Sequence, residues 1–198
     1  AAEYAQAEAN VIRWLREHAG EIAASRALRA EAIVRMNVLR KLSAEGKTGP
    51  VRDMLQSCEV SGHKEIIFSM FNKPIADLGA AFPNSVTLTG SVSTKNRQKL
   101  VERFQSEPGL CFFFGNTIAA GVGITLTAAD RVRFLDLPWH PAQKLQAEDR
   151  AHRFGQKRTV TILDMIAKGT IDERLSAIIA NKQAIIEQAV EGRPGAPV

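Results

Sequence analysis

Cysteine is scarce in this chain of 198 residues, where Cys58 and Cys111 are the two examples. Two cysteines so far apart provide neither a disulfide framework nor the ligand spacing of a metal site. The four histidines do not cluster along the chain either. We therefore expect reduced thiols, with Cys111 buried in an apolar strand, and no metal site.

Long hydrophobic runs are also missing. No apolar stretch approaches the roughly 18 residues that a membrane-spanning helix requires. The first residues include the charged Glu3 and Glu8 and do not have the pattern of a signal peptide. These absences predict no membrane partner and a cytoplasmic or nucleoid location, or a nuclear one in a eukaryote.

A phosphate-binding loop of the Walker A type, which ends in Gly-Lys-Ser or Gly-Lys-Thr, is absent from the sequence. The glycine spacing of a dinucleotide-binding fingerprint is absent as well. We therefore expect that the isolated chain holds no cofactor and does not hydrolyse ATP by itself.

Positive charge and apolar residues are both plentiful. The chain has 26 Lys and Arg against 21 Asp and Glu, a net charge of +5, and 45% of its residues are hydrophobic. The apolar fraction suffices for a sizeable core. The positive charge is compatible with nucleic-acid binding, because Lys and Arg release the counterions condensed on phosphates. Many basic domains bind no nucleic acid, so the charge leaves both alternatives open.

Short apolar segments alternate with helical ones through most of the chain. Strands are predicted over residues 65–70, 85–89, 110–114, 131–136 and 159–166. Helices are predicted over residues 72–82, 93–105 and 141–154, and in a last segment from Thr170. This alternation predicts an α/β fold with a parallel sheet flanked by helices. Ligands of such sheets bind beyond the carboxyl ends of the strands.

The two ends of the chain have different patterns. Residues 1–46 have helical periodicity, and the Gly- and Pro-containing stretch 46–50 predicts a break before the next helix. The last helix should bury six apolar residues: Ile171, Leu175, Ile178, Ile179, Ile185 and Ile186. We accordingly divide the chain into a helical segment (1–46), an α/β lobe (47–191) and a flexible Gly/Pro-rich tail (192–198).

A cluster of polar residues lies in the predicted helix 141–154. Gln146, Arg150 and Arg153 have the spacing i, i+4, i+7 and would share one helix face. Asp149 could brace Arg153 on the next turn. Two guanidiniums side by side match a polyphosphate and could stabilise a transferring γ-phosphoryl group, as arginine fingers do. The alternative is a solvated, salt-bridged helix face.

Two loops after predicted strands could hold phosphates. Gly121 and Gly123 follow the strand 110–114 and would let the backbone approach a phosphate oxygen, although such a turn can also be a plain turn. Gly90 and Ser91 precede a helix N-terminus near Arg97, where a backbone phosphate could bind. The alternative for this second loop is a simple serine N-cap.

Trp139 follows the predicted strand 131–136. At that edge of the sheet an indole could contact a nucleotide or a DNA backbone. It could equally pack a loop against the body of the protein.

The order of these segments resembles the C-terminal RecA-like lobe of SWI/SNF-type superfamily 2 DNA translocases. Residues 65–69 and 88–91 resemble motif IV and its extension, and residues 116–127 resemble motif V. Residues 136–141 are similar to a segment that usually reads Asp-x-x-Trp-Asn-Pro, and residues 146–156 resemble motif VI. The resemblance covers residues from about 60 to 180.

The resemblance implies a composite ATP site. In the family, an N-terminal lobe holds ATP and Mg²⁺, and this lobe supplies two arginine fingers, which correspond to Arg150 and Arg153. Gln146 and Asp149 would position them. The whole protein would then be a DNA-dependent ATPase, of which this chain alone is expected to be inactive.

The resemblance also implies double-stranded DNA as a partner, together with the N-terminal lobe of the same polypeptide. The positions that match the DNA side of the family lobe are Ser69, Gly90, Ser91, Arg97, Asn116 and Thr117, and we add Trp139. One alternative is a non-catalytic DNA-binding or interaction module derived from such a lobe. Another is an unrelated Rossmann-like domain that binds a nucleotide sugar.

Three positions depart from the family pattern. Ile118 stands where motif V usually has a basic residue, Thr125 where it usually has Asn, and His140 replaces the Asn of Trp-Asn-Pro. The departure at Ile118 weakens any phosphate contact carried over to that position.

Overall fold

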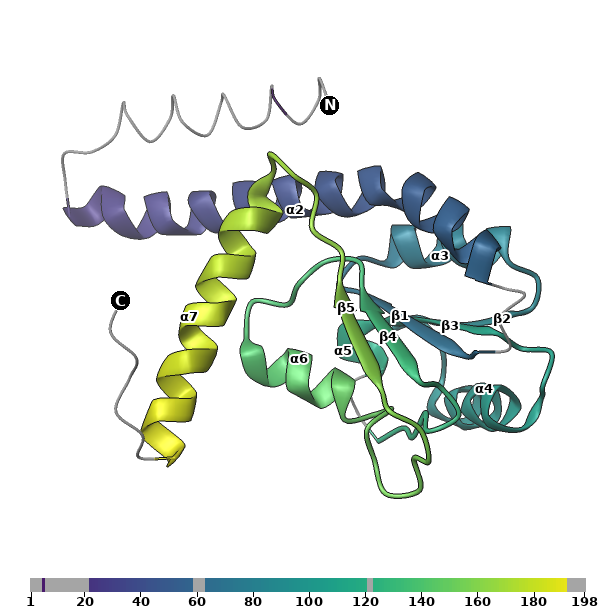
Figure 1. Cartoon of the computed structure of the whole chain (residues 1–198). Helices are drawn as coiled ribbons and strands as arrows, with labels where there is room; N and C mark the ends of the chain where they lie inside the picture. The colour runs from purple at the N-terminus through teal and green to yellow at the C-terminus, as the bar shows by residue number, and fades with distance from the viewer. Residues whose placement is uncertain (1–4, 6–21, 59–62, 121–122, 192–198) are drawn as a thin grey trace.

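The computed structural model describes residue 5 and residues 22–58, 63–120 and 123–191. Its centre is a sheet of five parallel strands in the order β2-β3-β1-β4-β5 (Figure 1). The strands are β1 (Glu65–Ser69), β2 (Ser85–Leu88), β3 (Phe112–Asn116), β4 (Arg131–Phe134) and β5 (Thr161–Asp164). All five predicted strands are present, with ends displaced by two residues or fewer, which confirms the RecA-like α/β fold.

Helices cover both faces of this sheet (Figure 1). On one face lie α2 (Ile22–Cys58) and α3 (Asn72–Ala81), and on the other lie α4 (Thr94–Ser106), α5 (Thr117–Ala120) and α6 (Pro141–Glu148). The last helix, α7 (Ile171–Glu191), contacts both α2 and α6. Cys111 just precedes β3 and is half-buried rather than buried, and the side chain of Cys58 lies outside the described part.

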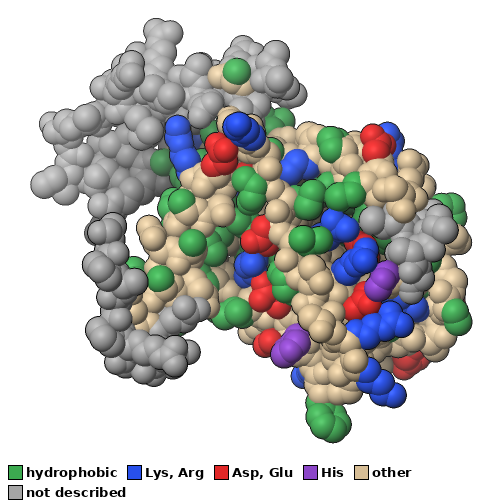
Figure 2. All heavy atoms as spheres, in the orientation of Figure 1, with side chains coloured by type: hydrophobic (Ala, Val, Ile, Leu, Met, Phe, Trp, Pro, Cys, Tyr) green, Lys and Arg blue, Asp and Glu red, His purple; other side chains and the backbone are tan. Residues whose placement is uncertain are grey.

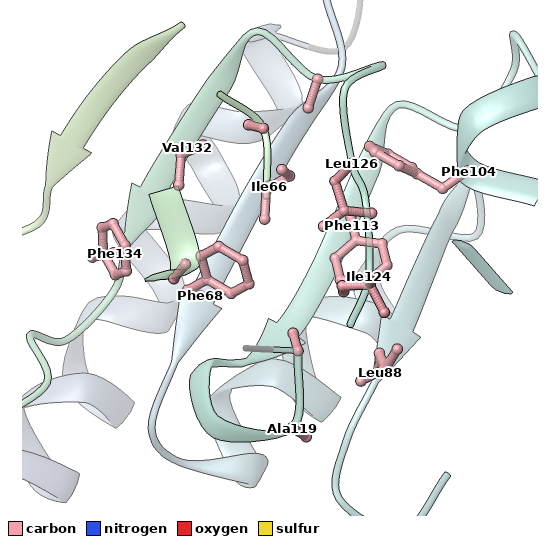
Figure 3. Packing of buried hydrophobic residues seen from close by; sticks show 14 of the residues in the cluster. Ile66, Phe68, Leu88, Phe104, Phe113, Ala119, Ile124, Leu126, Val132 and Phe134 are labelled. Carbon is pink, nitrogen blue, oxygen red and sulfur yellow. The ribbon is translucent and has the colours of Figure 1, made fainter. Parts of the chain in front are cut away.

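The alternation of side chains along the strands produces two apolar cores, one for each face of the sheet. Figure 3 shows the larger one, in which Phe68, Phe113 and Phe134 from three strands point to the same side of the sheet. Ile124 and Leu126, from the segment between α5 and β4, lie beside Phe113 in this core. This packing fixes the segment that carries Thr125, which becomes important for the candidate site.

Charge is not concentrated on the face that carries β5. Figure 2 shows acidic and basic side chains interspersed there instead of a patch of one sign. Buried ion pairs account for part of the charge: Glu65 is fully buried and lies 2.6 Å from the Arg133 guanidinium and 3.1 Å from that of Arg131. The net charge of the chain therefore does not locate a phosphate-binding surface, and individual residues have to do so.

The predicted break at residues 46–50 is wrong, because α2 continues through it to Cys58. Pro50 lies inside the helix and removes one helical hydrogen bond. Burial on both sides of the proline compensates, since Leu39, Val51 and Leu55 all lie in the interior. The domain division at 46/47 therefore falls inside one helix and stays a prediction, as does the tail 192–198, which lies outside the described residues.

Helix α6 ends at Glu148, six residues before the predicted end, and a series of turns follows. Bonds of the helical kind continue as far as the His152 amide, which donates to the Glu148 carbonyl at 3.0 Å. The carbonyl of Arg150 instead accepts a long-range bond from the amide of Leu126 at 2.7 Å, and the helical pattern is not continued from there. Gly155 does adopt a positive φ, +101°, but it closes this turn region and not the helix.

Helix α7 buries fewer residues than its sequence predicts. Ile171, Leu175 and Ile179 are buried as expected. Ile178, Ile185 and Ile186 are exposed, so this part of the prediction is wrong. Length explains Ile185 and Ile186, because the second half of α7 extends beyond the sheet and the helices that cover it (Figure 1). Ile178 lies in the first half, and it points about 100° away from the buried Ile179 around the helix.

Candidate functional site

The two candidate arginine fingers meet at one backbone carbonyl. Nη1 of Arg150 donates to the carbonyl oxygen of Ile124 at 3.4 Å, and Nη1 of Arg153 donates to the same oxygen at 3.5 Å. Arg153 also donates to Oγ1 of Thr125 at 2.8 Å. The predicted helix face is wrong, since both arginines lie in the turns after α6, yet the structure still brings their guanidiniums together.

The surroundings of this arginine pair are open. Arg153 is exposed and Arg150 half-buried, while the predicted supporting residues Gln146 and Asp149 are both exposed. Arg153 contacts Ile124 and Thr125 instead of Asp149, so the predicted Asp149 brace is not formed. Arg150 is instead held by its Nε, which donates to the carbonyl of Gln146 at 3.1 Å.

A glutamine side chain fixes the loop that follows the arginine pair. Nε2 of Gln156 donates to three carbonyl oxygens, of Ala129 at 2.7 Å, Thr127 at 3.1 Å and Ala151 at 3.2 Å. Its Oε1 accepts from the amide of Arg158 at 2.9 Å. These bonds tie the loop to the segment before β4, so the arginine pair sits on a constrained backbone.

The glycine loop is only partly described. Gly121 lies outside the described residues. Gly123 is exposed, has a φ of +71°, and a Cβ added to it would meet no atom within 4 Å. Gly123 and Thr125 line a cavity of about 450 Å³ whose other wall is α4, so the groove reaches the residue that holds Arg153.

The ends of β1 and β3 bring three predicted DNA-side residues together. Ser69 and Asn116 are register partners, and Thr117 follows directly. Ser69 is fully buried, and its hydroxyl donates to the carboxylate of Asp136. Nδ2 of Asn116 donates to the carbonyl of Met70 at 3.1 Å. Both side chains hydrogen-bond to other residues of the protein and so hold the carboxyl edge of the sheet together.

The hydroxyl of Thr117 differs from these two. Its Oγ1 is buried and has no hydrogen-bond partner among the described residues. A buried hydroxyl without a partner is unfavourable, so Thr117 is a position of this edge that its contacts within the described residues do not explain.

The turn before α4 is the exposed part of this edge. Gly90 and Ser91 are exposed, and the half-buried Arg97 holds their turn. Its guanidinium donates to the carbonyls of Val92 at 2.9 Å, Ala119 at 3.2 Å and Gly90 at 3.4 Å. The alternative of a simple serine N-cap is not borne out, because Ser93 makes no side-chain capping bond.

Trp139 is half-buried and packs on α2. Its Nε1 donates to Oδ1 of Asn37 at 3.3 Å, and the Arg40 guanidinium lies 4.8 Å from the centre of its ring. The structure therefore has the loop-packing arrangement that the sequence left open.

Two charged residues of this region were missed by the sequence interpretation. Asp136 is buried and accepts from the Ser69 hydroxyl and from the Met70 amide at 3.1 Å, and Arg40 lies 3.7 Å from it. Burial raises the pKa of Asp136, while these hydrogen bonds and the charge of Arg40 oppose that shift. A carboxylate directly after an apolar strand was a signal for Asp136, but no local pattern marked Arg40.

Within the described residues, no cluster of His, Cys, Asp and Glu has the geometry to hold a metal ion. None of the helices in that part of the chain is both long and apolar enough to cross a membrane.

Comparison with known proteins identifies the lobe. The family described as "Helicase conserved C-terminal domain" matches residues 46–155. The chromatin-remodeling ATPase INO80 of Saccharomyces cerevisiae is 34% identical over 159 residues, which are 78% of this chain and 11% of that protein. The helicase domino of Drosophila melanogaster is 36% identical over 152 residues, 74% of this chain and 5% of that protein.

A solved structure agrees with these sequence matches. The crystal structure of the C-terminal part of the Fun30 ATPase domain superposes with a TM-score of 0.57 at 31% identity, covering 60% of this chain and 40% of that one. The chain spans about a tenth or less of the length of INO80 and of domino. Fold, motifs and comparisons together show that the chain belongs to the helicase C-terminal domain family, as a lobe related to the SWI/SNF-type chromatin-remodelling ATPases.

Proposed function

We propose that this lobe completes a composite ATP site by supplying Arg150 and Arg153 to ATP and Mg²⁺ held by an N-terminal lobe of the same polypeptide. The observation that carries the proposal is the convergence of both guanidiniums on the Ile124 carbonyl. Each guanidinium carries a permanent charge and several donors in a planar fork. Two of them held together form a donor cluster for phosphate oxygens.

The chemistry asked of the arginine pair is electrostatic. In phosphoryl transfer, charge spreads over the equatorial oxygens of the transferring group, and a guanidinium placed there stabilises it. Donors that are already in place need little reorganisation during the reaction. The bonds of Arg153 to Thr125 and Ile124 provide this placement. Both acceptors are neutral oxygen atoms, so a charged phosphate can replace them. Gln146 and Asp149 are exposed beside the pair and available to a closing N-terminal lobe.

We further propose that the exposed turn at Gly90 and Ser91 contacts the phosphate backbone of duplex DNA. Arg97 keeps this turn in place, and the exposed Lys95 adds positive charge at the start of α4. Contacts to backbone phosphates carry no sequence information, so binding should be nearly independent of sequence. The similarity to the chromatin-remodeling ATPase INO80 supports this proposal and a location with the DNA of the cell.

The direct test is ATP hydrolysis by the polypeptide in which this chain is joined to its N-terminal lobe. With saturating duplex DNA, Arg153→Ala should lower the turnover rate by roughly 10³-fold or more, the range known for arginine fingers. ATP binding should persist, because the N-terminal lobe holds the nucleotide. Arg52→Ala is the matched control, since Arg52 is exposed on α2 and pairs with its neighbour Asp53 at 3.4 Å.

Unchanged turnover in Arg153→Ala would contradict the composite site. The lobe would then be better described as a non-catalytic DNA-binding or interaction module. The isolated chain should not hydrolyse ATP in either case, and turnover by the purified chain would contradict the assignment of ATP to the other lobe.

A further inference from the structure

A buried arginine on α2 lies where the ends of β1 and β4 meet. Arg40 is 2% exposed, and its guanidinium donates to the carbonyl of Leu137 and to Oδ1 of Asn37 at 3.2 Å. It lies 3.7 Å from the carboxylate of Asp136. A residue from the helical segment thus contacts the loop that follows β4.

Aromatic rings enclose the same guanidinium. The centre of the Trp139 ring lies 4.8 Å from it, and that of Phe71 lies 5.7 Å from it. Trp139 follows β4 and Phe71 follows β1, so one cation holds both strand ends. Cation–π contacts of a desolvated guanidinium contribute roughly 2 kcal/mol.

A buried guanidinium at this position is not what stability alone would favour. Nε of Arg40 is buried and has no hydrogen-bond partner among the described residues. Burial lowers the pKa of Arg40, while the charge of Asp136 opposes that shift. Apolar residues of similar volume often serve stability as well as a buried ion pair or better. Apolar residues could not, however, make the directional contacts of the guanidinium.

The ion pair of Arg40 with Asp136 is followed by hydrogen bonds that lead to the proposed DNA-binding turn. Asp136 accepts from the Met70 amide at 3.1 Å, and the Met70 carbonyl accepts from Nδ2 of Asn116 at 3.1 Å. The chain of contacts then runs along α5 to Ala119.

Two more contacts complete this connection. Oδ1 of Asn116 accepts from the amide of Ala119 at 3.3 Å, and the Ala119 carbonyl accepts from Arg97 at 3.2 Å. Arg97 in turn holds Gly90. These contacts form a continuous path from Arg40 on α2 to the exposed turn.

We propose that Arg40 is a positioning residue through which α2 sets the geometry of the carboxyl edge of the sheet and so controls duplex DNA binding. This inference rests on the proposed DNA contact of that edge. It assigns α2 a role in coupling in addition to its role in covering the sheet.

The chain offers a matched control for this inference in Lys47. It lies on the same helix, is also buried, and its Nζ lies 2.6 Å from Asp172 and 2.7 Å from the Met165 carbonyl. These contacts join α2 to the residue after β5 and to the start of α7, and none of them is a bond to the residues after β1 and β4. Lys47→Met therefore removes a comparable buried cation that acts on Asp136 only as a nearby charge and bonds to no group of the proposed connection.

The experiment compares Arg40→Met with Lys47→Met in the whole chain. Duplex affinity is measured by fluorescence anisotropy with a labelled short duplex at fixed salt, and Tm is measured in parallel. Both variants should lower Tm, because each leaves a buried carboxylate without its cation. Arg40→Met should weaken duplex binding by about tenfold at a temperature where it remains folded. Lys47→Met should stay within about twofold of the wild type.

A second readout concerns Trp139 directly and needs no DNA. In a Trp14→Phe background, acrylamide quenching of Trp139 fluorescence should rise in Arg40→Met and remain at the wild-type value in Lys47→Met. Equal effects of the two variants on affinity and on quenching would overturn the inference and leave Arg40 with a structural role only. If the wild type binds no duplex, the proposed DNA contact fails, and the quenching comparison still decides whether Arg40 positions the edge.

Discussion

At the scale of single residues, a buried carboxylate at the amino edge of the sheet shows how neighbouring groups stabilise a buried charge in this lobe. Asp130 directly precedes β4 and is 5% exposed. It lies 2.7 Å from Nδ1 of His63 and 3.0 Å from the Arg158 guanidinium. Burial opposes ionisation of Asp130, but the hydrogen bonds and charges of His63 and Arg158 outweigh it and lower its pKa.

This lowered pKa predicts how stability depends on pH. A carboxylate with a depressed pKa in the folded state stabilises fully above its ordinary pKa, here 3.8, and loses this contribution as the pH falls further. Asp130→Asn should therefore lower the free energy of unfolding by about 1–3 kcal/mol at pH 6. The difference from the wild type should shrink below pH 3.8.

Urea unfolding at pH 6 and at pH 3 measures both differences. Asp53→Asn is the control, because Asp53 is an exposed residue whose partner is its neighbour Arg52. A difference between Asp130→Asn and the wild type that is the same at both pH values would rule out the carboxylate charge as its source.

At the scale of elements, two helical glycines have opposite surroundings. Gly46 lies inside α2 and is exposed, and a Cβ added there would meet no atom within 4 Å. Gly79 lies in α3, where a Cβ would come within 2.1 Å of Oγ1 of Thr87 and 3.3 Å of its Cβ. The packing of α3 on β2 thus requires glycine, whereas the continuity of α2 does not.

Alanine substitutions at these two glycines should therefore have opposite effects. Gly46→Ala should raise the free energy of unfolding by up to about 1 kcal/mol, because alanine is the better helix former. Gly79→Ala gains the same helical preference, but overpacking against Thr87 costs about 1–3 kcal/mol, so a net loss is expected. Urea unfolding of both variants tests this, and destabilisation by Gly46→Ala would show that α2 needs its glycine.

The same scale shows which parts of the fold could be predicted. The strands follow from local apolar patterns, and all five are present. The end of α6 could not be predicted, because the carbonyl of Arg150 accepts a bond from the amide of Leu126, which lies 24 positions earlier in the chain. The exposed Ile186 of α7 lies seven residues after the buried Ile179 and therefore on the same helix face, and only the extent of the neighbouring elements separates them.

At the scale of the whole molecule, the proposed DNA contact predicts a salt dependence. If the edge at Gly90 and Ser91 binds phosphates, the logarithm of duplex affinity should fall linearly with the logarithm of salt concentration. Lys95 is exposed at the start of α4. Lys95→Gln should reduce the steepness of this dependence by about one unit, the effect of one lost phosphate contact.

Anisotropy titrations over a series of salt concentrations measure this slope. Lys41→Gln is the control, because the exposed Lys41 lies on α2 and pairs with Glu45 at 3.9 Å. A slope that does not depend on Lys95 would mean that DNA binds elsewhere on the molecule. A flat response to salt in the wild type would contradict the proposed phosphate contacts altogether.

Local patterns in the amino-acid sequence were enough to predict the parallel α/β lobe, the position of the arginine pair in the chain and the resemblance to the translocase family. These features follow from periodicity, turn residues and motif order. The meeting of both guanidiniums at Ile124, the burial of Ser69 on Asp136 and the contact of Arg40 with the edge of the sheet became visible in the folded lobe alone. They depend on packing, because a polar side chain bonds to whichever group the fold brings within hydrogen-bond distance, and for Arg40 that group lies 97 positions along the chain.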